Sequence, residues 1–152
     1  MFSLYVVLKF IHILAVIVAV GSNITYGIWI VRSQRDPSHA GFVLKGVKFL
    51  DDRVANPAYG VVLLTGLLMV FGGPFKITDL WIIVALVLFA ALILFGIVLY
   101  SPVLRDQVRL AEAGDTTSAE FGRLGRRGQM LGQATGVILL VILVMMVFQP
   151  HL

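Results

Sequence analysis

One histidine stands inside an otherwise apolar stretch near the start of the chain. Ile, Leu and Val surround His12, and the only other ionisable group there is Lys9, whose long side chain can reach the end of the stretch. A buried imidazole can serve as an axial ligand of a tetrapyrrole iron, or it can accept and release a proton. It can equally hydrogen-bond to a neighbouring helix and only stabilise packing. His12 is therefore the main candidate for chemistry, and both interpretations are open.

Helical spacing places two more polar side chains on the face of His12. Asn23 and Tyr26 follow it by eleven and fourteen residues, which are close to whole numbers of helical turns. Most other residues of the stretch are Ile, Leu and Val, which suit a lipid environment. The spacing predicts a polar stripe that faces the inside of a helix bundle, with Asn23 and Tyr26 as further contacts of a ligand held by His12.

The elements that must position this stripe are membrane helices. Hydrophobic residues make up 59% of the 152 residues and charged residues only 13%, whereas about 25% is typical of soluble domains. The mean hydropathy is +0.98. Such a chain has too little polar surface to cover a soluble fold, so residues 1–152 are predicted to form a single transmembrane domain in the lipid bilayer. Since the chain has no cysteine, disulfides and thiolate ligands are excluded.

Four apolar stretches predict an all-α, four-transmembrane-helix bundle. The list of expected spans is 4–31, 55–73, 79–100 and 130–148. The third helical pattern continues past Pro102, with a kink there, to a stop at Gly114. A capping box at residues 117–120 predicts that the fourth helix begins before its apolar part. Residues 41–54 alternate apolar and charged side chains at helical spacing, which indicates a short amphipathic helix at the membrane surface between the first two spans.

The basic residues predict the orientation of the bundle. Ten of the twelve Lys and Arg residues lie in the two segments 32–53 and 105–127. The positive-inside rule puts both segments inside, so the two termini and the loop 72–78 are expected outside. No basic stripe alternates with aromatic residues, and nucleic acid is therefore not an expected partner.

A second axial ligand for a haem would have to come from elsewhere in the chain or from another subunit. His39 lies in a basic segment and His151 at the C-terminus, both outside the apolar stretches. Met69 lies in the same half of the membrane as His12, and it completes the predicted cofactor-binding set of His12, Asn23, Tyr26 and Met69. A methionine in a membrane helix is more often a space-filling residue than a ligand.

Three glycines at intervals of four residues occupy the fourth helix. Gly128, Gly132 and Gly136 form a G-x-x-x-G-x-x-x-G ridge, on which another helix backbone can approach closely. The ridge predicts tight helix packing, within the chain, in a homo-oligomer or in a larger membrane complex.

Two short sequence segments resemble known membrane families. Residues 8–16 (LKFIHILAV) with Gly21 resemble the first helix of HemJ-type protoporphyrinogen oxidases and of CopD-like copper-resistance domains. Residues 53–58 (RVANPA) and 64–66 (LTG) are similar to their second helix. The whole pattern resembles a related family of small bacterial predicted integral membrane proteins. The resemblance implies a bundle in the bacterial cytoplasmic membrane, with His12 in the position of a haem-ligating histidine.

Two differences from the HemJ-type enzymes favour binding over catalysis. Those enzymes carry a Lys in the third helix and an Arg late in the first, whereas residues 81–100 are uncharged and no cation lies between Lys9 and Arg32. No catalytic residue is therefore assigned. The first hypothesis is a protein that binds haem b or a related tetrapyrrole through His12. The second is a non-enzymatic accessory or scaffold subunit that docks through the glycine ridge of the fourth helix.

Overall fold

The structure, a computed structural model, describes residues 3–150, and these form helices joined by short turns. His151 lies outside the described residues. The α-helices are α1 Leu4–Gln34, α2 Ala40–Leu50, α3 Asn56–Gly72, α4 Leu80–Phe95, α5 Ser101–Glu112 and α6 Ala119–Phe148. Shorter turns join some of them end to end, so that four rods are long and apolar enough to cross a membrane: Leu4–Gln34, Pro37–Gly72, Leu80–Glu112 and Ala119–Phe148. The predicted all-α bundle with four spans is confirmed.

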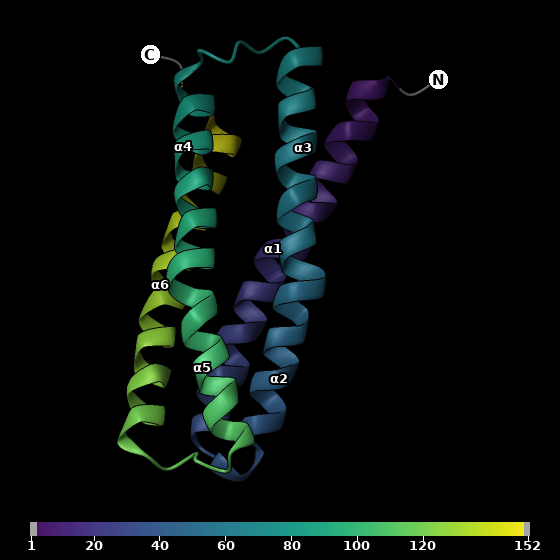
Figure 1. Cartoon of the computed structure of the whole chain (residues 1–152). Coiled ribbons are helices and arrows are strands. Elements are labelled where there is room, and N and C mark those ends of the chain that lie inside the picture. Colours follow the sequence, from purple (N-terminus) through teal and green to yellow (C-terminus); the bar gives the residue numbers. More distant parts are fainter. Residues whose placement is uncertain (1–2, 151–152) are drawn as a thin grey trace.

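The two ends of the bundle differ in charge. Both termini and the loop between α3 and α4 lie at one end, and the α1–α2 and α5–α6 connections lie at the other (Figure 1). The two basic segments occupy the second end, which is called the basic end below. This is the relative arrangement that the charge pattern predicts. Which membrane face the basic end adopts stays a prediction of the positive-inside rule.

The amphipathic segment between the first two spans is helical, but it does not lie across the bundle as a surface helix. α2 continues through the turn η2 (Asp51–Ala55) into α3, so the second span runs from the basic end without a break (Figure 1). Leu44 and Val47 of α2 are buried in a core cluster with residues of α1 and α5. The apolar stripe of α2 therefore packs against protein, which corrects the expected position.

Two π-helical turns end two residues before Pro57 and Pro102 of the long helices. In η2 the N–H of Asn56 bonds to the carbonyl of Asp51, and in η3 (Gly96–Tyr100) the N–H of Ser101 bonds to the carbonyl of Gly96. Proline has no N–H and its ring crowds the carbonyl four residues earlier. The wider turn next to Pro57 and Pro102 accommodates that defect without ending the helix. At Pro102, where a kink is expected, the chain has this wider turn, and the third helix continues through α5 to Glu112, as the predicted stop at Gly114 implies.

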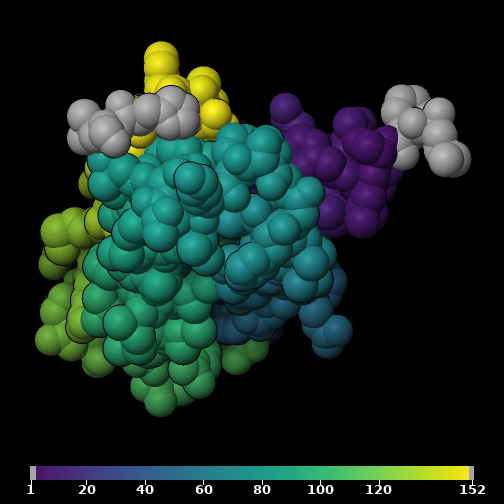
Figure 2. Space-filling model, turned by 90° about the horizontal axis from the view of Figure 1, so that it is seen from above, coloured from purple at the N-terminus to yellow at the C-terminus, as the bar shows by residue number. Residues whose placement is uncertain are grey.

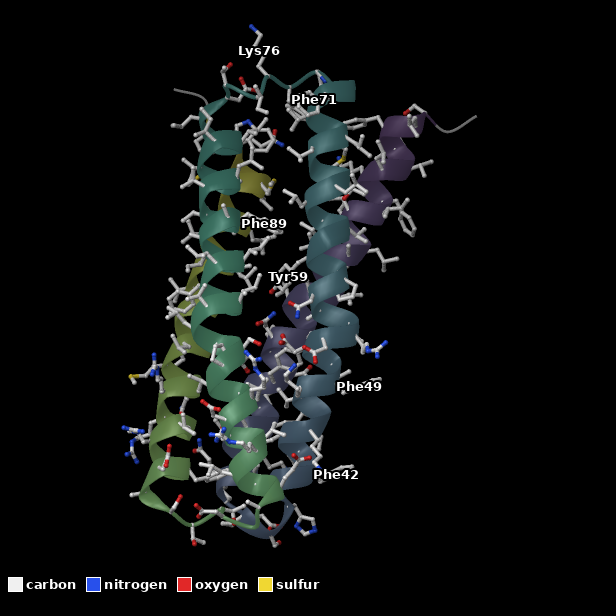
Figure 3. All side chains as sticks on the ribbon, viewed as in Figure 1. Phe42, Phe49, Tyr59, Phe71, Lys76 and Phe89 are labelled. Carbon is white, nitrogen blue, oxygen red and sulfur yellow. The ribbon has the colours of Figure 1, made fainter. Side chains whose placement is uncertain are left out.

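The helices pack as two pairs that join near the basic end. α1 lies along α3, and α4 lies along α6, while α2, α5 and α6 connect the pairs. α3 and α4 do not pack backbone against backbone. Instead the rings of Tyr59 and Phe89 meet edge to face between them, with centroids 6.1 Å apart (Figure 3). From above, the first turns of α1 lie beside α3 and far from the end of α6 (Figure 2). The bundle is thus tightest at the basic end.

Local signals define several helix ends. Ser118 caps α6 by accepting a hydrogen bond from the Phe121 N–H at 3.1 Å. The early start of the fourth helix is confirmed, but the capping residue is Ser118 and not Thr117, the first residue of the predicted capping box. Gly114 follows α5 with a φ of 78°, the left-handed conformation that closes many helices and that glycine adopts without strain.

Candidate functional site

His12 is buried between α1 and α3 and bonded to a threonine. Its Nδ1 atom lies 2.9 Å from Oγ1 of Thr65, and that hydroxyl lies 2.6 Å from the carbonyl oxygen of Val61. A hydroxyl has one proton and a carbonyl only accepts, so the Thr65 proton is directed to Val61. The Thr65 oxygen then accepts a hydrogen bond from the N–H group at Nδ1 of His12. The neutral ring is therefore the Nδ1–H tautomer, with the lone pair on Nε2.

The imidazole of His12 lies against bare backbone on α3. A Cβ atom added to Gly66 would stand 3.2 Å from Cε1 and 3.6 Å from Nδ1 of the ring. The first distance is shorter than an ordinary van der Waals contact, so any side chain at position 66 would displace the imidazole. Thr65 and Gly66 therefore act together: one orients the ring and the other leaves room for it.

Asn23 makes a second polar contact between the same two helices. Its Nδ2 atom donates to the hydroxyl of Tyr59 at 2.6 Å and to the carbonyl of Ala19 at 2.9 Å. Both amide protons are thereby used. Asn23 thus joins α1 to α3 nearer the basic end than His12 does.

Tyr26 and Met69 lie at opposite ends of this α1–α3 seam. Tyr26 is 3% exposed in the core cluster near the basic end, and its hydroxyl has no hydrogen-bond partner among the described residues. Met69 lies one turn beyond Thr65 towards the termini and is half-buried. At 1.5 Å per residue, His12 and Tyr26 are about 20 Å apart along α1. The four predicted residues therefore follow one seam but do not surround one point.

The partners of His12 were not identifiable as such from the sequence. Thr65 and Gly66 stand out there only as part of the 64–66 motif. Nothing in that motif says that it faces residue 12, which lies 53 positions away. Within residues 3–150, no three or more His, Asp or Glu side chains gather in a way that could hold a metal ion. The donor available at this seam is one oriented imidazole.

A comparison with protein families decides the membership of the chain. The model of a family described as "Predicted integral membrane protein (DUF2269)" matches residues 6–150. The chain belongs to this family. The match covers the four spans, except for the first two residues of α1, and both sides of the contact between His12 and Thr65. The comparisons with curated proteins and with solved structures give no match. Membership in the DUF2269 family agrees with the expected class of integral membrane protein.

In this member of the DUF2269 family, the glycine ridge of α6 has two parts. A Cβ at Gly128 would meet the Val103 side chain at 3.6 Å, and one at the preceding Gly125 would meet the Gln107 amide at 3.1 Å. Gly132 and Gly136 are exposed, and no atom lies within 4 Å of a Cβ added there. The part nearest the basic end packs against α5, and the rest of the ridge is open along the membrane face.

Proposed function

We propose that this DUF2269 family member binds haem or a related tetrapyrrole in the membrane, with His12 as an axial ligand. The supporting observation is the bond from His12 Nδ1 to Thr65. Histidines that bind metals usually donate their other ring N–H to an oxygen, which sets the tautomer and the ring orientation. His12 is held in this way by Thr65, through its Nδ1 atom.

The residues around His12 suit such a ligand. The residue His12 is 9% exposed, and Ala15 and Ala19 follow it as small buried residues on the same face of α1. Thr65, whose hydroxyl donates to the Val61 carbonyl, keeps the proton of His12 on Nδ1. This bond makes Nε2 a more basic ligand for a metal ion. Bound haem b would supply one-electron redox chemistry. A further iron ligand would come from Met69 or from a residue of a second subunit.

The resemblance of residues 8–16 to the first helix of HemJ-type and CopD-like proteins gives independent support, since His12 stands where a haem-ligating histidine is expected. By the same resemblance we assign the protein to the bacterial cytoplasmic membrane, with the basic end in the cytoplasm. α4 carries no charged residue, which favours binding or electron transfer over porphyrinogen oxidation.

The absorption spectrum of the full chain, purified in detergent and reconstituted with haemin, tests the proposal. We expect a Soret band in the wild type and in His39→Ala, a histidine variant in the exposed turn before α2. His12→Ala should lose the band while circular dichroism shows unchanged helicity. A wild-type protein with full helicity and no Soret band would overturn the proposal.

A chemical rescue separates an iron ligand from a histidine that only packs. His12→Gly leaves space for free imidazole next to Thr65. If His12 binds iron, added imidazole should restore the Soret band of the reconstituted variant. If the variant is folded and binds haemin equally well with and without imidazole, the iron is held elsewhere and the assignment of His12 is wrong.

A second candidate function rests on the open part of the glycine ridge. Gly132 and Gly136 are exposed beside Val137 and Leu140, which are 62% and 61% exposed. Such a surface fits a non-enzymatic subunit that docks through α6, in a homo-oligomer or a larger membrane complex. Native mass spectrometry of the extracted protein tests it. Gly132→Leu should dissociate the assembly and Gly60→Leu, at an equally open position of α3, should not. A monomeric wild type without partners would exclude this role.

A further inference from the structure

Two grooves meet at Arg32, at the basic end of α1. The first is a shallow surface hollow of about 460 Å³ on α1 alone, and it runs past Gly27, Ile28 and Val31 to Arg32 and Arg35. The second, of about 370 Å³, lies between α1 and α2 and is also bordered by Arg32. Arg32 thus borders both grooves.

Glycines and apolar side chains line both grooves. No atom lies within 4 Å of a Cβ added to Gly27 or Gly46, which border the first and the second groove respectively. Val43 and Val47 line the second groove from α2. Phe42, at its edge, is 83% exposed and projects away from the helix (Figure 3). Hydrocarbon chains fit these walls better than a hydrated solute does.

The cations at the groove ends have no acidic partner. Arg32 and Arg35 form no salt bridge within residues 3–150, whereas Lys45 is bonded to Glu112 and Lys48 to Asp52. The free guanidinium groups are therefore available to an external anion, which an arginine can bind through two parallel hydrogen bonds.

One carboxylate borders the second groove, and it is already bonded. Oδ1 of Asp36 accepts from the Ser38 hydroxyl at 2.5 Å, and Oδ2 accepts from His39 Nδ1 at 2.7 Å. These bonds lower the pKa of Asp36, so it remains ionised and tied to its own turn. Asp36 therefore pairs with His39 of its own turn and forms no salt bridge with Arg32 or Arg35 within residues 3–150.

The grooves lie at the level of α1 that is expected at the membrane interface. α1 has 31 residues, which makes it about 46 Å long against a hydrocarbon core of about 30 Å. Its basic end therefore reaches the lipid headgroups. Trp29, one turn before Arg32, is 47% exposed and borders the second groove, and tryptophan prefers this interface.

We propose that the two grooves beside Arg32 bind an anionic phospholipid from the leaflet at the basic end. Its phosphate contacts Arg32 and Arg35, and its acyl chains follow the apolar walls. Charge complementarity selects an anionic headgroup, and the apolar walls select a lipid over a free phosphate. This site is independent of His12, which lies at the other end of α1.

Native mass spectrometry of the full chain in detergent tests the charge requirement. Phosphatidylglycerol and phosphatidylcholine with identical acyl chains are the probes, and we expect retention of phosphatidylglycerol. Arg32→Gln should lower that preference roughly fivefold, the size expected for one cation at a lipid surface. Arg123→Gln removes an exposed arginine of α6 and should leave it unchanged. Equal binding of both lipids, or equal losses in both variants, would overturn the proposal.

A second set of variants tests the grooves without changing the charge. Gly46→Leu fills one groove and Gly27→Leu the other, whereas Gly60→Leu adds the same side chain to an open position of α3. Phosphatidylglycerol retention should fall in the first two and persist in the third, at equal helicity. If both groove variants are folded and bind as the wild type does, or if inorganic phosphate displaces the lipid, the proposed site is wrong.

Discussion

Nδ1 of His12 and Oγ1 of Thr65 lie 2.9 Å apart across the interface of α1 and α3. The hydroxyl donates a hydrogen bond to the Val61 carbonyl within α3, so the direction of the interhelical bond is determined. One bond thus joins two helices and orients an imidazole. Its contribution to folding and its role in ligand binding can be measured separately.

Removing the hydroxyl of Thr65 should weaken the packing of α1 on α3. Thr65→Val keeps the shape of the side chain and is expected to lower the free energy of unfolding by about 1 kcal/mol, as for other hydrogen bonds between membrane helices. Thr25→Val is the matched control, because Thr25 makes the same bond to the carbonyl four residues back, without an interhelical partner. Unfolding in SDS mixtures, followed by circular dichroism, measures both. Equal losses would show that the contact with His12 contributes nothing.

A methyl group at position 66 should displace the ring of His12. Gly66→Ala puts a Cβ 3.2 Å from Cε1, and overpacking of this kind costs about 1–3 kcal/mol. Gly60→Ala, on the same helix with no atom within 4 Å, should be neutral or stabilising by up to about 1 kcal/mol. The same unfolding assay distinguishes them. A Gly66→Ala protein as stable as Gly60→Ala would mean that the ring moves at no cost.

The contact between Asn23 and Tyr59 should appear as a coupling energy. A double-mutant cycle with Asn23→Ala and Tyr59→Phe removes the amide and the phenol hydroxyl, while the phenyl ring can still contact Phe89. We expect a coupling of about 0.6 kcal/mol, the average for such bonds in a membrane protein. Additive effects in the cycle would show that the two groups do not interact in the membrane protein.

The π-turn η3 should tolerate the loss of one residue. Its hydrogen bond spans five residues instead of four, so deleting Val98 together with Pro102→Ala should convert the turn into regular α-helix. α5 would then keep its orientation, with Leu104 still buried. The control deletes Val87 of α4, in place of Val98, from the Pro102→Ala protein. This deletion should rotate the following residues of α4 by about 100° about the helix axis and prevent folding. Size-exclusion profiles and thermal melting of both proteins test this. If the two deletion variants are equally stable, η3 does not contain an extra residue relative to a regular α-helix.

The spans were predictable because each depends on its own residues. A long apolar stretch must satisfy its backbone hydrogen bonds internally in lipid, so it forms a helix whatever its neighbours are. The stop at Gly114 and the cap at Ser118 are similarly local. The position of α2 was not predictable, because an amphipathic pattern shows that one face avoids water, without showing whether lipid or protein covers it.

The candidate site was only half predictable for the same reason. His12 is identifiable as a lone ionisable group in an apolar span, since burying such a group is costly wherever the helix packs. Its partners depend on how α1 lies on α3, which brings residues 12 and 65 together across 53 positions of chain. The distance between His12 and Tyr26 follows from helical rise alone and already places them at separate levels of the bundle.

The sequence by itself determined the membrane helices, their order, the end of the bundle that carries the basic segments and the position of one buried imidazole. Only the tertiary structure decided which nitrogen of His12 is free, which glycines of α6 are covered and which arginines lack acidic partners. Hydropathy and capping act within a few helical turns and can be read along the chain. Hydrogen bonds and close contacts between helices depend on relative position and rotation, which no single segment encodes.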